Sequence, residues 1–144
     1  MNLTAVLAVA ALGLAAPLSV LAQSSTEAVG AVNEDVLAAT SANIQGEAIA
    51  YPTGTPEISS WTITFEKGGH SSLHQHPVPL YVYVLEGELE VRPEGGEPYR
   101  EAQGEAYIEP QNHMMQAFNV ADGPTKILIV ALGAQGQKTT VAAE

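Results

Sequence analysis

Short apolar runs with the alternation of β-strands fill the chain from about residue 46 onward. The runs are rich in Val, Ile, Tyr and Thr, and clusters of Gly and Pro separate them. The expected strands are EAIAYP (47–52), EISSWTITFE (57–66), LYVYVLEGELEV (80–91), AYIEP (106–110), MQAFNV (115–120) and TKILIVALG (125–133). Because no helical pattern lies between them, the sequence predicts an all-β domain, folded as an antiparallel sandwich or barrel.

The longest of these runs has two features that set its packing. Its first half, 80–85, is apolar at every position, so we expect the strand there to be covered on both faces. Gly87 then allows a bend or a bulge before polar and apolar residues alternate again. Further on, Gly95 and Gly96 favour a tight hairpin, since both can take positive φ.

The first 22 residues contain no charged side chain and consist mainly of Ala, Leu and Val. Val20 and Ala22 are small residues at the positions that a signal peptidase requires for a cut before Gln23. The pattern therefore predicts a signal peptide over residues 1–22 and a secreted or periplasmic protein, with no membrane contact after cleavage. The alternative is an uncleaved membrane anchor, for which the apolar stretch is about long enough.

Three further segments follow the signal peptide. Residues 23–45 are small and polar and form an N-terminal arm, in which Asn33 is expected to cap a short helix over 34–40. Residues 46–133 form the β-barrel, and 134–144 form a C-terminal tail. The sequence shows no internal repeat.

Composition and charge exclude several classes of function. The formal net charge is −11 with only 5 Lys and Arg residues, which argues against nucleic acid and against anionic membrane surfaces. The chain has no cysteine, so disulfides, thiolate metal sites and a cysteine nucleophile are excluded.

Two histidines stand just before the longest apolar run. His74 and His76 are two residues apart, and in an extended backbone such side chains leave the same face of the strand. They can therefore bind one metal ion together, and His113 is the candidate for a third ligand from a distant strand. The same spacing is also found in surface histidines of ordinary strands, and His70, in a glycine-rich turn, is expected to be a loop residue.

Two stretches around these histidines resemble the paired motifs of the cupin superfamily. GGHSSLHQHPVPLYVYVLEG is similar to the first motif, in which a glycine (Gly68) precedes an H-x-H pair and another glycine (Gly87) closes it. GEAYIEPQNHMMQAFN is similar to the second, from Gly104 through Pro110 to His113. The resemblance implies a small double-stranded antiparallel jelly-roll barrel that binds a divalent metal inside it.

The first motif departs from the family pattern at one position. Cupins usually place a metal-binding glutamate where this chain has Leu80 or Tyr81. The resemblance then leaves His74, His76 and His113 as a neutral ligand set, which suits Zn, Fe, Cu or Ni better than Mn or Mg. Such a set with an open fourth position resembles a Lewis-acid or water-activating site.

Glu109 is the candidate for a replacement carboxylate. If the segment before Pro110 is extended, Tyr107 and Glu109 share one face. A glutamate inside a barrel needs a metal or a ligand imidazole as its partner, and within reach of the site it is also the candidate catalytic general base. The alternative is a glutamate at the solvent-exposed rim.

Three functional hypotheses follow. A metal-dependent enzyme, such as an oxygenase, isomerase or lyase, acts on a small oxygen-bearing molecule in the barrel. A binding module holds a small molecule or a metal without turnover, and the missing carboxylate at Leu80 favours it. A structural protein forms a homodimer around an empty site.

Overall fold

The computed structural model describes Gly30 and residues 33–143, and the expected signal peptide lies outside these residues. The body of the fold begins at Asp35. Its strands are β1 (Pro56–Phe65), β2 (His74–Gln75), β3 (Leu80–Glu86), β4 (Glu88–Pro93), β5 (Tyr99–Ala102), β6 (Ala106–Ile108), β7 (Met115–Asn119), β8 (Thr125–Ala134) and β9 (Val141–Ala142). No helix in the described part of the chain is long and apolar enough to cross a membrane.

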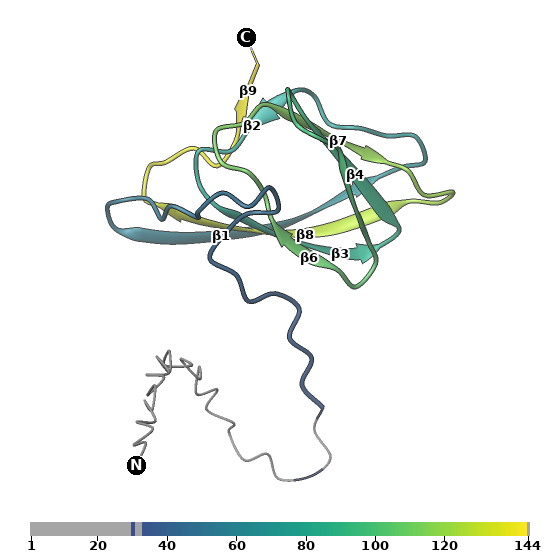
Figure 1. Ribbon diagram of the computed structural model, residues 1–144, viewed down its shortest axis with the longest axis horizontal. Coiled ribbons are helices and arrows are strands. Elements are labelled where there is room, and N and C mark those ends of the chain that lie inside the picture. The colour runs from purple at the N-terminus through teal and green to yellow at the C-terminus, as the bar shows by residue number, and fades with distance from the viewer. Residues whose placement is uncertain (1–29, 31–32, 144) are drawn as a thin grey trace, which may run out of the picture. The chain divides into compact units, whose positions relative to one another are not determined.

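The strands form two sheets that face each other (Figure 1). One sheet has four strands in the order β1-β8-β3-β6, and the other has five in the order β5-β4-β7-β2-β9. All neighbouring strands in both sheets are antiparallel. The predicted all-β, antiparallel two-sheet architecture is thus confirmed.

Two predicted elements are absent from the described residues. The stretch 47–52 is not a strand, and its only ladder contact is a single bridge between Ala42 and Ala48. Residues 34–40 form no helix either, and Val36 and Leu37 are 61% and 49% exposed. A helix of about two turns is not stable in water unless it packs an apolar face against a partner.

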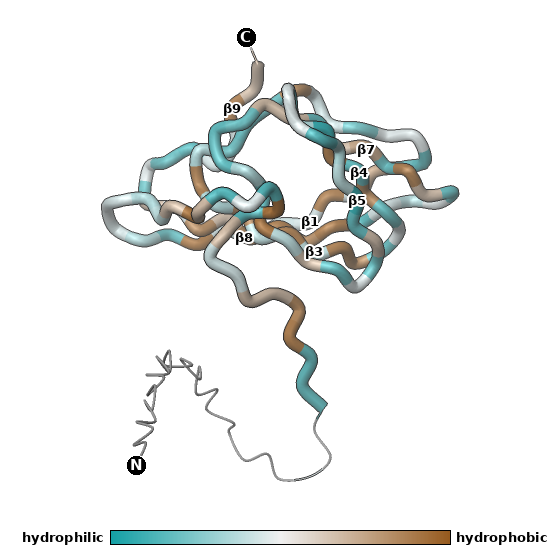
Figure 2. The backbone as a smooth tube through the Cα atoms, in the orientation of Figure 1, coloured by the Kyte–Doolittle hydropathy of each residue, from teal (hydrophilic) through white to brown (hydrophobic). Residues whose placement is uncertain are grey.

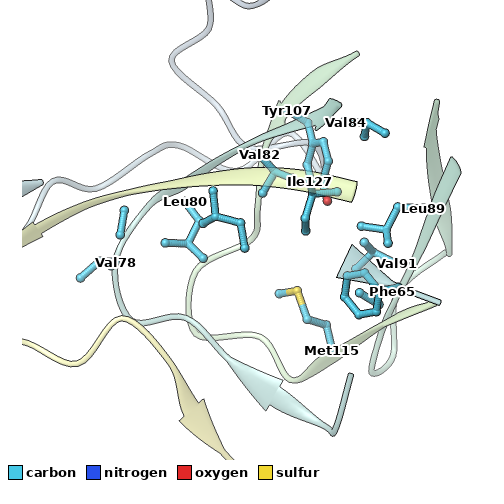
Figure 3. Packing of buried hydrophobic residues seen from close by; sticks show 13 residues of the cluster. Phe65, Val78, Leu80, Val82, Val84, Leu89, Val91, Tyr107, Met115 and Ile127 are labelled. Carbon is cyan, nitrogen blue, oxygen red and sulfur yellow. The ribbon is translucent and has the colours of Figure 1, made fainter. Parts of the chain in front are cut away.

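The hydrophobic core fills the space between the sheets (Figure 3). Its fully buried side chains include Val78, Leu80, Val82, Val84, Leu89, Val91 and Met115. Hydrophobic positions, brown in Figure 2, gather along β3 and β8 of the four-stranded sheet. Each fully buried Leu or Val side chain contributes about 1.5–3 kcal/mol to folding.

The run 80–91 divides at Gly87 into two strands of different sheets. Gly87 has a φ of 81°, and a Cβ there would come within 2.7 Å of the Pro124 carbonyl oxygen. Only glycine fits both conditions, so the chain bends here as expected. The expected two-sided burial of the first half is wrong, because Leu85 is 37% exposed and the tyrosines between the buried residues are half-buried.

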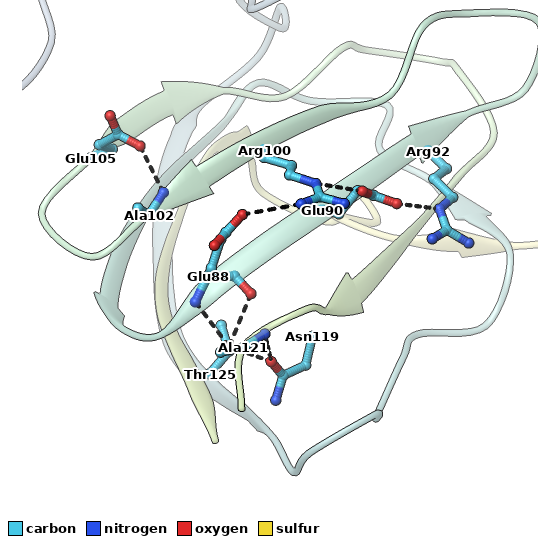
Figure 4. Close-up of polar contacts among 9 residues, drawn as sticks. All are labelled: Glu88, Glu90, Arg92, Arg100, Ala102, Glu105, Asn119, Ala121 and Thr125. Carbon is cyan, nitrogen blue, oxygen red and sulfur yellow. Dashed lines mark hydrogen bonds and ion pairs between the residues drawn. The ribbon is translucent and has the colours of Figure 1, made fainter. Parts of the chain in front are cut away.

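Buried polar groups brace the sheets. Glu90 accepts hydrogen bonds from Nε of Arg92 (2.5 Å) and of Arg100 (2.6 Å), and these guanidinium partners lower its pKa (Figure 4). The Asn119 amide donates to the carbonyls of Phe65, Glu66 and Gly123 at 2.9–3.0 Å. Asn119 therefore ties the end of β1 to the turn before β8.

The chain returns to the five-stranded sheet after β8. β9 pairs with β2, and the Ala143 N–H donates to the Leu73 carbonyl at 3.1 Å. The last residues thereby cover the strand that carries His74.

Candidate functional site

A cavity of about 220 Å³ lies between the two sheets. One wall is apolar and comes from the inner faces of β1 and β8: Trp61, Ile63, Phe65, Ile127 and Ile129. The other side is polar and is formed by Ser71, Ser72, His74, His76, Glu109 and Thr140. The cavity is therefore a concave, mostly apolar site with a few converging polar groups, as small-molecule sites are.

His74 and His76 both line the cavity, and their ring centroids are 4.8 Å apart with nearly perpendicular planes. β2 carries His74, and His76 follows directly after the last residue of β2. A backbone hydrogen bond holds His76 in place. Its carbonyl accepts a hydrogen bond from the Asn112 N–H at 2.8 Å. The spacing thus brings the two imidazoles to one place.

Backbone carbonyls fix the tautomer of both rings. Nδ1 of His76 lies 2.7 Å from the Thr139 carbonyl oxygen, and Nδ1 of His74 lies 2.7 Å from that of Ser72. A carbonyl can only accept a hydrogen bond, so Nδ1 carries the proton in each ring. In the neutral imidazoles Nε2 then bears a lone pair that is free to bind a metal or accept a proton.

Glu109 projects into the barrel and is 6% exposed. The Tyr107 hydroxyl donates to its Oε1 at 3.5 Å, at the outer limit of a hydrogen bond. Its Oε2 lies 3.2 Å from Nε2 of His76, yet has no hydrogen-bond partner among the described residues. Of the two alternatives for this residue, the structure therefore selects the interior position and not the rim.

The contact between His76 and Glu109 is not an ion pair. Burial, the larger cause, together with the nearby His74, lowers the pKa of His76 to about 4 although the Thr139 carbonyl acts against it. Burial raises the pKa of Glu109 to about 7, opposed by the Tyr107 hydroxyl. Both groups are thus driven towards their neutral forms.

Two lone-pair-bearing atoms that face each other at 3.2 Å need a proton or a cation between them. Two ligands of one tetrahedral ion, with bonds of about 2.0–2.1 Å, lie about 3.3 Å apart. The orphaned Oε2 of Glu109 and Nε2 of His76 therefore fit a divalent cation, and His74 offers a further imidazole nitrogen. Among the described residues, however, no three His, Asp or Glu side chains form a complete metal cluster.

His113 does not join the other two histidines in this structure. Its side chain is 40% exposed, and its Nε2 lies 3.2 Å from Oε1 of Glu47 rather than in the cavity. Asn112 explains the difference, because its φ of 59° is left-handed and turns the chain just before His113. The expected set of His74, His76 and His113 is thus not assembled here.

Sequence reasoning missed the role of Thr139. Its carbonyl orients His76 from 63 residues further along the chain, in a segment expected to be a tail. No sequence signal marks a backbone carbonyl for this role. His70, by contrast, is an exposed loop residue whose Nδ1 lies 2.9 Å from the Ser71 carbonyl oxygen.

Two facing antiparallel sheets, with a polar-ended cavity between them, define a small jelly-roll barrel. The family model that describes the cupin domain matches residues 61–131. The chain belongs to the cupin superfamily. No curated protein shows significant sequence similarity to it.

Solved structures of similar fold include the DMSP lyase DddQ from Ruegeria pomeroyi, with 24% identity, coverage of 60% of this chain and 43% of that one, and a TM-score of 0.51. The oxalate decarboxylase of Lactobacillus farciminis has 20% identity, coverage of 59% and 26%, and a TM-score of 0.52. An oxalate oxidase in complex with glycolate has 24% identity, coverage of 59% and 45%, and a TM-score of 0.50. The chain spans less than half of each of these proteins, and the likeness shows the fold alone.

Proposed function

We propose that this cupin binds one divalent metal through His76 and Glu109, with His74 as the third protein ligand, and holds a small molecule in the adjoining cavity. The observation that carries the proposal is the buried Oε2 of Glu109, which has no hydrogen-bond partner among the described residues and faces Nε2 of His76 at 3.2 Å. A carboxylate and two imidazoles suit Zn, Fe, Cu and Ni.

The protein's own groups prepare this site. The Thr139 and Ser72 carbonyls hold the Nδ1 protons of His76 and His74, which leaves both Nε2 atoms as donors to a metal. The Tyr107 hydroxyl lies at Oε1 of Glu109 and restrains the carboxylate. A bound metal supplies a Lewis acid that polarises an oxygen atom of the ligand.

A binding module without turnover is the second candidate, and one observation favours it. At the place of the family's usual glutamate, Leu80 is fully buried in the core and Tyr81 is half-buried on the outer side of β3. No carboxylate can therefore enter from this strand. An enzyme of the lyase, isomerase or oxygenase type would have to work with Glu109 alone, as a ligand or as a general base.

Metal analysis of purified variants tests the proposal. The protein is loaded with Zn²⁺, desalted and measured by elemental analysis, with circular dichroism as the check on folding. We expect about one zinc per wild-type chain, and little or none after desalting in His76→Ala and Glu109→Gln, because each loses a ligand and at least about tenfold in affinity.

His113→Ala is the matched control, because His113 is an imidazole outside the cavity. We expect its zinc content to equal that of the wild type. Zinc lost from His113→Ala but kept by Glu109→Gln would refute the proposed ligand set and restore the three histidines. Wild-type protein that takes up no metal would refute the metal site altogether.

A further inference from the structure

We propose that the cavity takes a largely apolar small molecule with a single polar head group that points to His76 and Glu109, and that it excludes ligands with a second charged group. This inference deepens the proposed function and rests on the same site. It concerns the body of the ligand, whereas the metal proposal concerns the head group.

The first step of the argument is the absence of cations from the cavity wall. No Lys or Arg of the described residues lines the cavity. The chain has only 5 such residues, and the interactions of three of them are accounted for elsewhere. Arg92 and Arg100 both bind Glu90, and Lys67 pairs with Asp122 at 3.3 Å.

The second step is the cost of a charged ligand body. A metal held by His76 and Glu109 would neutralise one anionic head group at the polar end. A second anionic group would then lie against Ile63, Ile127 or Ile129, on a wall to which no Lys or Arg of the described residues contributes. An unpaired buried charge is far more costly than a buried apolar group, so dianions are excluded from this wall.

The third step is size and shape. An apolar cavity of about 150 Å³ accommodates a benzene ring in another protein. The volume here, about 220 Å³, leaves room for a ring with a short substituent. Trp61 and Phe65 lie on the wall and offer the edge and face contacts that aromatic ligands prefer.

Trp61 also provides the readout, because it is the only tryptophan of the chain. The probes are benzyl alcohol and terephthalate, which both contain a benzene ring. Benzyl alcohol is uncharged, whereas terephthalate carries two negative charges. Each is titrated into the full chain, with EDTA and with Zn²⁺, while Trp61 fluorescence is followed. We expect saturable binding of benzyl alcohol with a dissociation constant on the order of 1 mM, and terephthalate at least about tenfold weaker.

Two variants on adjacent positions of β8 show whether the ring enters the cavity. Ile129→Phe fills the space beside Trp61, whereas Leu128→Phe adds the same group on the opposite face of the strand. We expect Ile129→Phe to weaken benzyl alcohol binding at least about tenfold and Leu128→Phe to change it less than about twofold. If Ile129→Phe does not fold, Ala117→Leu fills the same cavity from β7.

Three results would overturn the inference: no saturable signal with benzyl alcohol, terephthalate binding as tightly as benzyl alcohol, or equal losses in the two phenylalanine variants. The EDTA arm separates this inference from the metal proposal. If benzyl alcohol binds to a chain that takes up no zinc, the metal proposal is refuted and the apolar ligand site is supported. If the chain binds zinc but neither aromatic probe, the metal proposal is supported and the apolar ligand site is refuted.

Discussion

Replacing Glu109 with glutamine is expected to stabilise the metal-free protein at pH 8 and to leave its stability nearly unchanged at pH 4. The reason is the raised pKa of this buried carboxyl, which is about 7 in the folded chain against an ordinary value of 4.5. Between these values the folded protein holds a proton that the unfolded chain has released. Stability therefore falls as the pH rises from about 4.5 to 7 and is level above that window.

The magnitude follows from the same two values. The difference is 7 − 4.5 = 2.5 pH units, and each unit corresponds to about 1.4 kcal/mol, so ionised Glu109 costs about 3.5 kcal/mol. Glutamine has nearly the same shape and cannot ionise. His76, whose pKa is lowered to about 4, is present in both proteins, so its contribution largely cancels in the comparison.

Urea unfolding in EDTA at pH 4, 6 and 8, followed by circular dichroism, measures the effect. We expect Glu109→Gln to gain about 3 kcal/mol over the wild type between pH 4 and pH 8. Glu94→Gln, at an exposed turn, is the matched control and should stay within about 0.5 kcal/mol at every pH. A difference between Glu109→Gln and the wild type that does not vary with pH would contradict the buried, neutral carboxyl.

Three further predictions concern other parts of the chain. Removing residues 139–144 takes away the carbonyl of Thr139 that orients His76, together with β9, which pairs with the strand of His74, and should lower zinc affinity in calorimetric titration by about 10–100-fold; unchanged affinity would show that this segment does not support the two histidines. Asn119→Ala leaves one buried carbonyl and two partly buried carbonyls without their donor, and should lower the free energy of unfolding in urea by about 2–4 kcal/mol; a loss below about 1 kcal/mol would contradict this bracing. If the protein is exported, mass spectrometry of the secreted or periplasmic form should find Gln23 as its first residue, and an intact N-terminus would favour the anchor.

The strands were largely predictable because the alternation of apolar and polar residues indicates which face of a strand is buried. The extent of burial was not predictable for β3. Buried Val82 and Val84 alternate with Tyr81 and Tyr83, but all four are apolar, so the sequence alone could not tell one-sided from two-sided burial. Tyrosine tolerates a half-buried outer face because its ring is apolar and its hydroxyl is polar. Strand propensity also failed at 47–52, where the chain forms only the single bridge between Ala42 and Ala48, because propensity is a weak guide without cross-strand partners.

The site was predictable only where spacing fixes direction. The two-residue period places His74 and His76 at one cavity, and it places Glu109 on the same side as Tyr107. The period carries no information across a left-handed turn, and the turn at Asn112 is what sends His113 to the surface. The sequence motif identified segments that line the cavity but could not follow the chain through that turn.

If Glu109 binds the proposed metal, a proton and a divalent cation compete for the same atom in this protein. Oε2 of Glu109 faces Nε2 of His76, which is an acceptor because its ring proton is held at the Thr139 carbonyl. Below pH 7 a proton on the carboxyl relieves the opposed lone pairs, and a metal must displace that proton to bind. In the proposed site, the carboxylate that lowers the stability of the metal-free fold at pH 8 is therefore also the ligand that would favour metal binding there. A site built only from His76 and other neutral imidazoles would lack this link, since the pKa of His76 is already about 4.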